Sequence, residues 1–148
     1  MSISQQPSEA SAVSDVELTP EEAFAGIMLA AVAVDGHMAE VELQNLTITL
    51  KRSKLYRQQA SENIVATLKK LLNIIKSKGI DTLVQSSVAQ LPKHLSATVF
   101  AIATDITLAD GAMFNEELEI LSQLAESLSI PEDTVNQITQ VMMIKNRG

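Results

Sequence analysis

One stretch of the chain occurs twice, 75 residues apart: Asp35-Gly36-His37-Met38-Ala39-Glu40-Val41-Glu42-Leu43 and Asp110-Gly111-Ala112-Met113-Phe114-Asn115-Glu116-Glu117-Leu118. Asp, Gly, Met, Glu and Leu coincide in the two copies. The match extends outward, because Ile27 aligns with Ile102 and Leu46 with Leu121. An Asp-Gly pair readily ends a helix. An acidic residue in the first turn of the helix that follows stabilises that helix. Each copy therefore predicts a helix, loop, helix unit, at about residues 20–51 and 92–128.

Helical signals also fill the rest of the chain. The first unit opens with Thr19, Pro20 and Glu22, which are typical of an N-cap, a first helical position and a capping box. Between the units, apolar residues at helical spacing run to Gly79, a residue that favours the end of a helix. We predict an all-α fold of about seven helices, forming one domain over residues 19–148.

The composition restricts the class of protein. The chain has 148 residues, 46% of them hydrophobic but only 3% aromatic, which suits one core of closely packed helices. It has no cysteine, so disulfides, thiolate nucleophiles and cysteine-based metal sites are excluded. Residues 1–18 lack the basic start and apolar run of a signal peptide, and we expect a flexible tail. No stretch predicts a transmembrane segment, and we expect a cytoplasmic protein.

Charge is divided into three blocks. Residues 1–50 carry a net charge of −8, residues 51–94 carry +7, and residues 95–148 carry −6. The middle block predicts a basic surface between acidic ones. Nucleic acid is not the expected partner, because binding it usually takes aromatic residues among the basic ones and only Tyr56 lies nearby. Anionic lipid or an acidic protein fits this block better.

The repeated Asp-Gly-x-Met-x-x-x-Glu pattern matches the second half of a calcium-binding EF-hand loop. The first half is missing, since the positions of its first acidic ligands hold Ala31 and Ala33 in one copy and Ile106 and Leu108 in the other. A full EF-hand is therefore not predicted. Two interpretations remain: the carboxylates bind a divalent cation, or each loop is only a turn followed by a favourably placed acid.

Some neighbouring residues are candidates for an auxiliary role. Asp105 precedes the second loop by about one turn among apolar residues, so it either lies near the acidic loop, points to solvent or pairs with a lysine from elsewhere. His37 has a spacing from Glu40 that suits zinc, but the second copy has Ala112 at its place, which favours an exposed loop histidine.

At these residues the chain resembles the TerB-like tellurite-resistance family. The resemblance rests on Ala31-Val-Ala-Val-Asp35-Gly36 through Glu42, and on residues 101–111 continuing through Leu124-Ala-Glu-Ser-Leu-Ser-Ile-Pro131. It implies an all-helical, non-enzymatic protein associated with stress and tellurite resistance, with a metal-binding acidic cluster and protein partners that include membrane-associated ones. Carried onto this sequence, the metal ligands implied are Asp35, Glu42, Asp110 and Glu117, with Glu40, Glu116 and Asp105 as auxiliary residues.

The sequence thus leaves two hypotheses. In the first, a TerB-like module holds calcium, magnesium or zinc through its acidic loops. In the second, a helical protein-interaction scaffold uses opposed acidic and basic surfaces and binds no metal. Neither hypothesis includes catalysis, because no nucleophile and base pattern and no phosphate-binding glycine loop occur in the sequence. An enzyme is a third interpretation, supported only by the pairs of acids, and a deep pocket with two acids facing each other would favour it.

Overall fold

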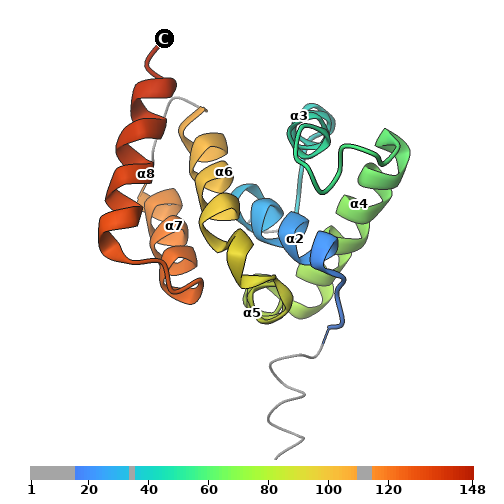
Figure 1. Cartoon of the computed structure of the whole chain (residues 1–148). Coiled ribbons are helices and arrows are strands. Elements are labelled where there is room, and N and C mark those ends of the chain that lie inside the picture. The colour runs from blue at the N-terminus through green and yellow to red at the C-terminus, as the bar shows by residue number, and fades with distance from the viewer. Residues whose placement is uncertain (1–15, 34–35, 110–114) are drawn as a thin grey trace, which may run out of the picture.

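The computed structural model describes residues 16–33, 36–109 and 115–148. This part of the chain forms seven α-helices, one short 3₁₀ helix and no strand, which confirms the all-α prediction (Figure 1). The helices are α2 (Pro20–Val32), α3 (Glu40–Lys51), α4 (Ser61–Lys78), α5 (Ile80–Gln90), η1 (Lys93–Leu95), α6 (Ser96–Ala109), α7 (Asn115–Ser127) and α8 (Glu132–Lys145). None of the described helices is long and apolar enough to span a bilayer.

Helix α2 lies at the centre of the bundle and contacts α4, α5 and α6 (Figure 1). It begins with the predicted capping box: the Thr19 hydroxyl accepts from the N–H of Glu22, and the Glu22 carboxylate accepts from the N–H of Thr19. Its residues 23–31 are all buried. A helix that is apolar all round belongs inside a bundle, so α2 is the core element on which the other helices pack.

Helices α2 and α5 pack closely against each other at a glycine. A Cβ placed on Gly26 of α2 would lie 2.4 Å from the Ser87 hydroxyl oxygen and 3.3 Å from a Leu83 methyl group of α5. Gly26 and Ser87 are buried. The absence of a side chain at residue 26 therefore sets how near the two helices approach.

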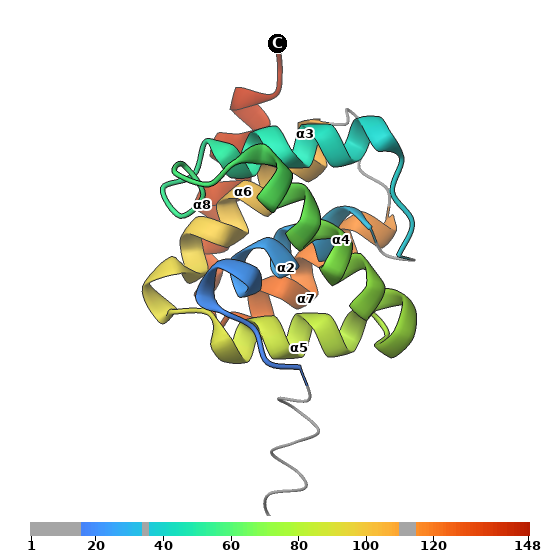
Figure 2. The same ribbon diagram turned by 90° about the vertical axis from the view of Figure 1, so that its right-hand side faces the viewer.

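The two repeat units pack differently. Helix α3 packs on α4, and Figure 2 shows it crossing the top of the bundle above α2, so α2 and α3 do not form an antiparallel pair. In the second unit, α7 packs directly on α6. The aligned leucines reflect the difference: Leu43 is buried, whereas Leu118 is 47% exposed. The repeat in sequence thus gives two pairs of helices, of which only the second packs together closely.

Residues 16–18, which the sequence placed in a flexible tail, make contacts with α5. Leu18 is buried, and its N–H donates to the Gln90 side-chain oxygen at 2.9 Å. The Gln90 amide nitrogen donates to the carbonyl of Val16 at 2.8 Å. Residues 16–18 therefore pack on α5, which corrects the predicted tail boundary; residues 1–15 lie outside the described part of the chain. A single glutamine provides both the donor and the acceptor for this extended segment.

The turn that closes the end of α7 contains a serine with a left-handed backbone. Ser129 has a φ of 57°, and the N–H groups of Ser129 and Ile130 donate to the carbonyls of Glu126 and Ala125, both at 3.0 Å. This pair of bonds is the Schellman motif, where glycine is the usual residue. The serine side chain opposes this conformation by about 1–2 kcal/mol.

Replacing Ser129 with glycine is therefore expected to raise the free energy of unfolding by about 0.5–1 kcal/mol, because the relief of strain exceeds the extra entropy of glycine in the unfolded chain. Urea denaturation measures the change. Ser129→Ala is the matched control, since alanine keeps the Cβ and should give no gain. An equal gain from both variants would show that the hydroxyl, and not the backbone, is unfavourable.

Candidate functional site

The structure describes the side chains of only three of the seven predicted metal ligands. Asp35 and Asp110 lie outside the described residues, and Glu116 and Glu117 are placed on α7 without a described side chain. The three described residues are Glu40, Glu42 and Asp105.

Glu42 acts as a helix cap. Its carboxylate accepts from the N–H of Ala39 at 2.9 Å, and with Glu40 it places two acids in the first turn of α3. Both side chains are exposed. Carboxylates at this end of a helix interact favourably with its unpaired N–H groups and its dipole. The position of Glu42 is thus explained by the start of α3, and a cation would have to displace this bond or share the carboxylate.

Asp105 joins two helices. One of its carboxylate oxygens accepts from the Asn146 side-chain amide at 2.8 Å and lies 3.2 Å from the Lys145 ammonium. Of the alternatives left by the sequence, the pairing with a distant lysine is the one observed. Asp105 therefore fastens the end of α8 to α6.

Gly36, the described glycine of the first Asp-Gly pair, lies next to a lysine of α4. It has a φ of 83°, and a Cβ placed there would lie 2.9 Å from Cγ of Lys76. The aliphatic stem of the Lys76 side chain therefore lies against the backbone of Gly36.

Among the residues that the structure describes, no group of three or more histidine or acidic side chains is arranged to hold a metal ion. Since both loop aspartates and both α7 glutamates lie outside that search, the predicted metal site stays a prediction.

A basic surface does form. It consists of seven exposed residues, which we call the basic end: Arg52, Lys54 and Arg57 in the loop before α4, and Lys69, Lys70, Lys76 and Lys78 on α4. The exposed acids of the last two helices are Glu119, Glu126, Glu132 and Asp133. Figure 1 shows α4 at one side of the molecule and α7 and α8 at the other, with α2, α5 and α6 between them. The basic end and the described acids of the last block therefore lie on different sides of the molecule, whereas the exposed Glu40 and Glu42 of the first block lie on α3, which packs on α4.

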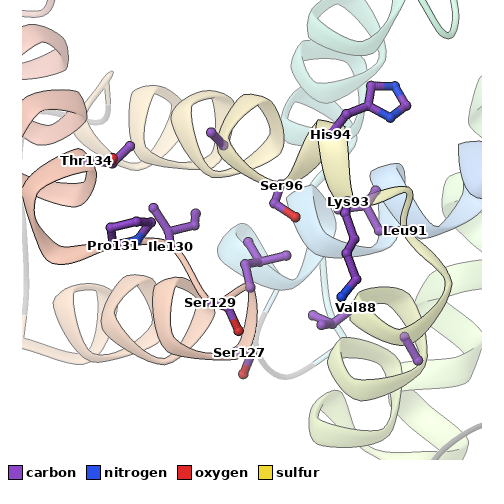
Figure 3. Close-up of a pocket in the computed structure, with 13 residues that line it drawn as sticks. Val88, Leu91, Lys93, His94, Ser96, Ser127, Ser129, Ile130, Pro131 and Thr134 are labelled. Atoms are coloured by element: carbon purple, nitrogen blue, oxygen red, sulfur yellow. The ribbon is translucent and has the colours of Figure 1, made fainter.

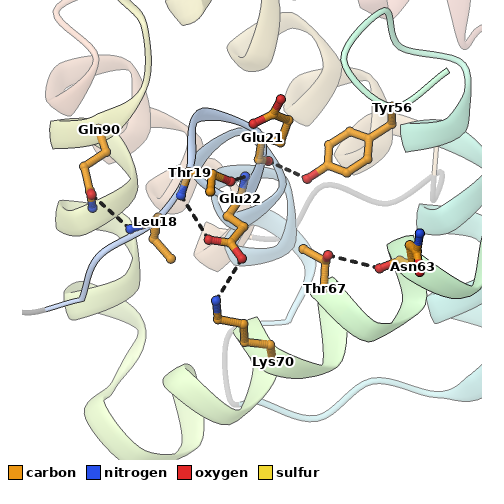
Figure 4. Close-up of polar contacts among 9 residues, drawn as sticks. All are labelled: Leu18, Thr19, Glu21, Glu22, Tyr56, Asn63, Thr67, Lys70 and Gln90. Atoms are coloured by element: carbon orange, nitrogen blue, oxygen red, sulfur yellow. Dashed lines mark hydrogen bonds and ion pairs between the residues drawn. The ribbon is translucent and has the colours of Figure 1, made fainter. Parts of the chain in front are cut away.

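Polar contacts fix the basic end to α2 (Figure 4). The Lys70 ammonium pairs with the Glu22 carboxylate at 2.8 Å. The Tyr56 hydroxyl, from the loop before α4, donates to the carbonyl of Glu21. Burial acts to raise the pKa of Glu22, but the Lys70 ammonium and the N–H of Thr19 outweigh it, so this pKa lies below its usual value. The capping box of α2 thus also anchors α4.

This network predicts an acid-dependent loss of stability. Because the folded state lowers the pKa of Glu22, its contribution is full above the usual pKa of 4.5 and is lost as the pH falls through the lower folded-state value. Glu22→Gln keeps an oxygen for the Thr19 N–H but loses the charge, so it should weaken the pH dependence of unfolding below pH 4.5. Glu126→Gln, on the opposite side, is the control. If the stability of both variants depended on pH in the same way below pH 4.5, Glu22 would not be the source of the acid-dependent loss.

The described aromatic residues offer no stacking surface for bases. Phe24, Tyr56 and Phe100 are each at most 2% exposed. Tyr56, the aromatic residue closest in sequence to the basic ones, is directed inward onto α2 (Figure 4). The basic end is thus a surface of charges without an exposed aromatic residue among those described, unlike the usual sites for single-stranded nucleic acid.

Two hollows, which the sequence did not indicate, lie on either side of Ile130. The first, the Lys93 hollow, has a volume of about 620 Å³ and is lined by Val88, Ala89, Leu91, Lys93, His94, Ser96, Ala97, Ser127, Leu128, Ser129, Ile130, Pro131 and Thr134. The second, the Glu126 hollow, has about 600 Å³ and is lined by Phe100, Leu118, Leu121, Ser122, Ala125, Glu126, Ile130, Glu132, Val135, Asn136 and Thr139. Sequence patterns report one helix at a time, so hollows shared by several helices leave no local signal.

Comparison of the chain with protein-family models, with curated proteins and with solved structures finds no match. The TerB-like resemblance therefore stays a prediction from the two sequence motifs.

Proposed function

We propose that this protein is a non-enzymatic binding module whose basic end docks an acidic segment of a protein partner. The observation that supports the proposal is the separation of charge: seven exposed Lys and Arg residues on α4 and its preceding loop lie opposite the acidic α7 and α8. Such a field steers an acidic partner to one side of the molecule and repels it from the other.

An acidic protein segment fits this surface better than a membrane does. Membrane-surface helices place apolar side chains beside their basic residues for insertion. Four of the six large exposed apolar residues of the described chain lie away from the basic end, on α7 and α8: Leu118, Val141, Met143 and Ile144. The other two, Val41 and Ile48, lie on α3, which packs on α4. A broad anionic surface would also meet the repulsion of a chain whose net charge is −7, whereas a short segment contacts only the basic end.

The experiment measures binding of a fluorescently labelled oligoglutamate peptide to the full chain by anisotropy. The test variant is Arg57→Gln with Lys69→Gln, because Lys70 and Lys76 have structural contacts and are left in place. Binding should weaken by about tenfold with the double variant, and it should weaken with added salt.

The matched control is Lys93→Gln with Arg147→Gln, which removes the same charge outside the basic end. Equal weakening by both variants would show that only the net charge matters and would refute the docking site. Binding to phosphatidylserine vesicles without binding to the peptide would favour a membrane partner instead.

A divalent cation held by the acidic loops is a second candidate, supported by the repeated Asp-Gly-x-Met-x-x-x-Glu pattern. Calorimetry with calcium, magnesium and zinc should then show weak binding, with a dissociation constant of about 10⁻⁴ to 10⁻³ M. Asp110→Asn and Glu117→Gln should weaken it. Asp105→Asn should not, since Asp105 is engaged by Asn146 and Lys145. No heat with any of the ions at millimolar concentration would exclude this candidate.

A further inference from the structure

The Lys93 hollow combines an apolar floor with a polar rim. Val88, Leu91, Leu128 and Ile130 line it from the end of α5 and from the α7–α8 turn. Leu91 and Leu128 are buried and form part of the core, so the floor is fixed by the fold. The volume of about 620 Å³ lies within the range of roughly 300–1,000 Å³ that small-molecule sites occupy.

The rim carries a cation and no acid. Figure 3 shows the Lys93 side chain extending toward Val88, whereas the His94 ring turns away from the other lining residues. Lys93 has no ion pair or side-chain hydrogen bond with another described residue. Among the described residues that line this hollow there is no aspartate or glutamate, although the chain as a whole is acidic. An amphipathic anion would find both an apolar wall and an unpaired ammonium here.

The neighbouring Glu126 hollow has the opposite character. It shares Ile130 and has nearly the same volume, but the charged residues among its described lining are Glu126 and Glu132. Apolar surface and size are therefore similar in the two hollows, and the sign of the charge distinguishes them. An anionic ligand should select the Lys93 hollow for electrostatic reasons alone.

We propose that the Lys93 hollow binds a small aliphatic carboxylate, with the hydrocarbon chain on the Leu91 and Leu128 floor and the carboxylate on the Lys93 ammonium. A charge-assisted hydrogen bond supplies the polar contact, and burial of methylene groups supplies the rest. The site lies outside the basic end and does not depend on the proposed docking of an acidic partner.

The test is a titration of the isotopically labelled full chain with sodium octanoate below its micelle concentration, followed by NMR. Saturable shifts are expected for the amides of residues 93–97 and 127–134. Lys93→Gln should weaken the affinity by about tenfold or more, which is the effect expected for a hydrogen bond to a charged group. Ala97→Trp, which fills the hollow while keeping Lys93, should also abolish the shifts.

Three controls keep the result specific. Glu126→Gln, in the other hollow, should leave the octanoate affinity unchanged. Octanol lacks the charge and acetate lacks the chain, so each should bind more weakly than octanoate. The proposal is overturned if Lys93→Gln binds octanoate as the unmodified protein does, if octanol binds equally well, or if the shifts map to the exposed apolar residues of α8. Circular dichroism shows whether each variant is folded.

Discussion

Replacing Gly26 with valine should lower the free energy of unfolding by about 3 kcal/mol. The new Cβ would lie 2.4 Å from the Ser87 hydroxyl oxygen and 3.3 Å from Leu83, and the two added methyl groups would enlarge the overlap. Helix α2 is buried on all sides, so it has no free side toward which to move. Overpacking of this kind costs about 1–3 kcal/mol and occasionally more, and valine recovers little of it through helix propensity.

Alanine at the same position separates the steric contribution from helix propensity. Gly26→Ala gains about 1 kcal/mol of propensity, and the contact at Ser87 opposes that gain. In a Ser87→Ala background the nearest oxygen is absent, so Gly26→Ala should become neutral or stabilising. Ser87→Ala alone should raise stability by about 1 kcal/mol, because the Ser87 hydroxyl is buried without a hydrogen-bond partner among the described residues.

Urea denaturation of the unmodified protein, Gly26→Ala, Ser87→Ala and the double variant forms a double-mutant cycle that tests whether residues 26 and 87 are in steric contact. Gly26→Val is measured in the same way. An additive cycle would mean that Gly26 and Ser87 are not coupled. A Gly26→Val protein as stable as the unmodified one would show that the approach of α5 to α2 does not depend on the glycine.

Replacing Tyr56 with alanine should cost about 3–5 kcal/mol, the range for truncation of a buried aromatic residue. Tyr56 is 1% exposed and donates to the carbonyl of Glu21, so it holds the loop before α4 on the start of α2. Tyr56→Phe keeps the ring and should cost only about 1 kcal/mol, the contribution of one hydrogen bond. The same denaturation measurement compares the two variants.

Tyr56 also predicts behaviour at high pH. Burial raises the pKa of its hydroxyl well above the usual value of 10, and the charges of Glu21 and Glu22 raise it further. The corresponding stability is complete below pH 10 and is lost as the pH rises toward the folded-state pKa. Tyr56→Phe should remove this alkaline loss. If Tyr56→Phe lost stability at high pH as the unmodified protein does, the alkaline loss of stability would belong to other groups.

The proposed docking surface depends on Tyr56 as well. Arg52, Lys54 and Arg57 belong to the loop that Tyr56 holds, and the Lys51 ammonium donates to the carbonyl of Gln59 within the same segment. Tyr56→Ala should therefore weaken oligoglutamate binding even where the protein remains folded, whereas Tyr56→Phe should not.

The helices were predictable because their boundaries depend on local chemistry. Thr19 and Glu22 cap α2, and Gly79, with a φ of 93°, ends α4 as its position in the sequence indicated. The packing of α3 on α4 was not predictable, since it depends on long-range contacts rather than on the repeat.

In the candidate site, too, local contacts were predictable from the sequence and long-range contacts were not. The likeness to half of an EF-hand loop and the TerB-like resemblance predicted Glu42 as a metal ligand. A glutamate at the third helical position also fits a cap, and the structure shows that contact. The partners of Asp105 are Lys145 and Asn146, far away in the chain, so no local pattern could identify them. The Lys93 hollow likewise arises only when η1 meets the α7–α8 turn.

The glutamine that holds residues 16–18 on α5 recognises only main-chain atoms. Gln90 accepts from the N–H of Leu18 and donates to the carbonyls of Val16 and Ser86, in the manner of a neighbouring β-strand. The side chain of Glu17 is exposed and takes no part. A substitution at position 17 should therefore leave this attachment intact, whereas Gln90→Glu should weaken it, because a carboxylate lacks the donor for the Val16 carbonyl.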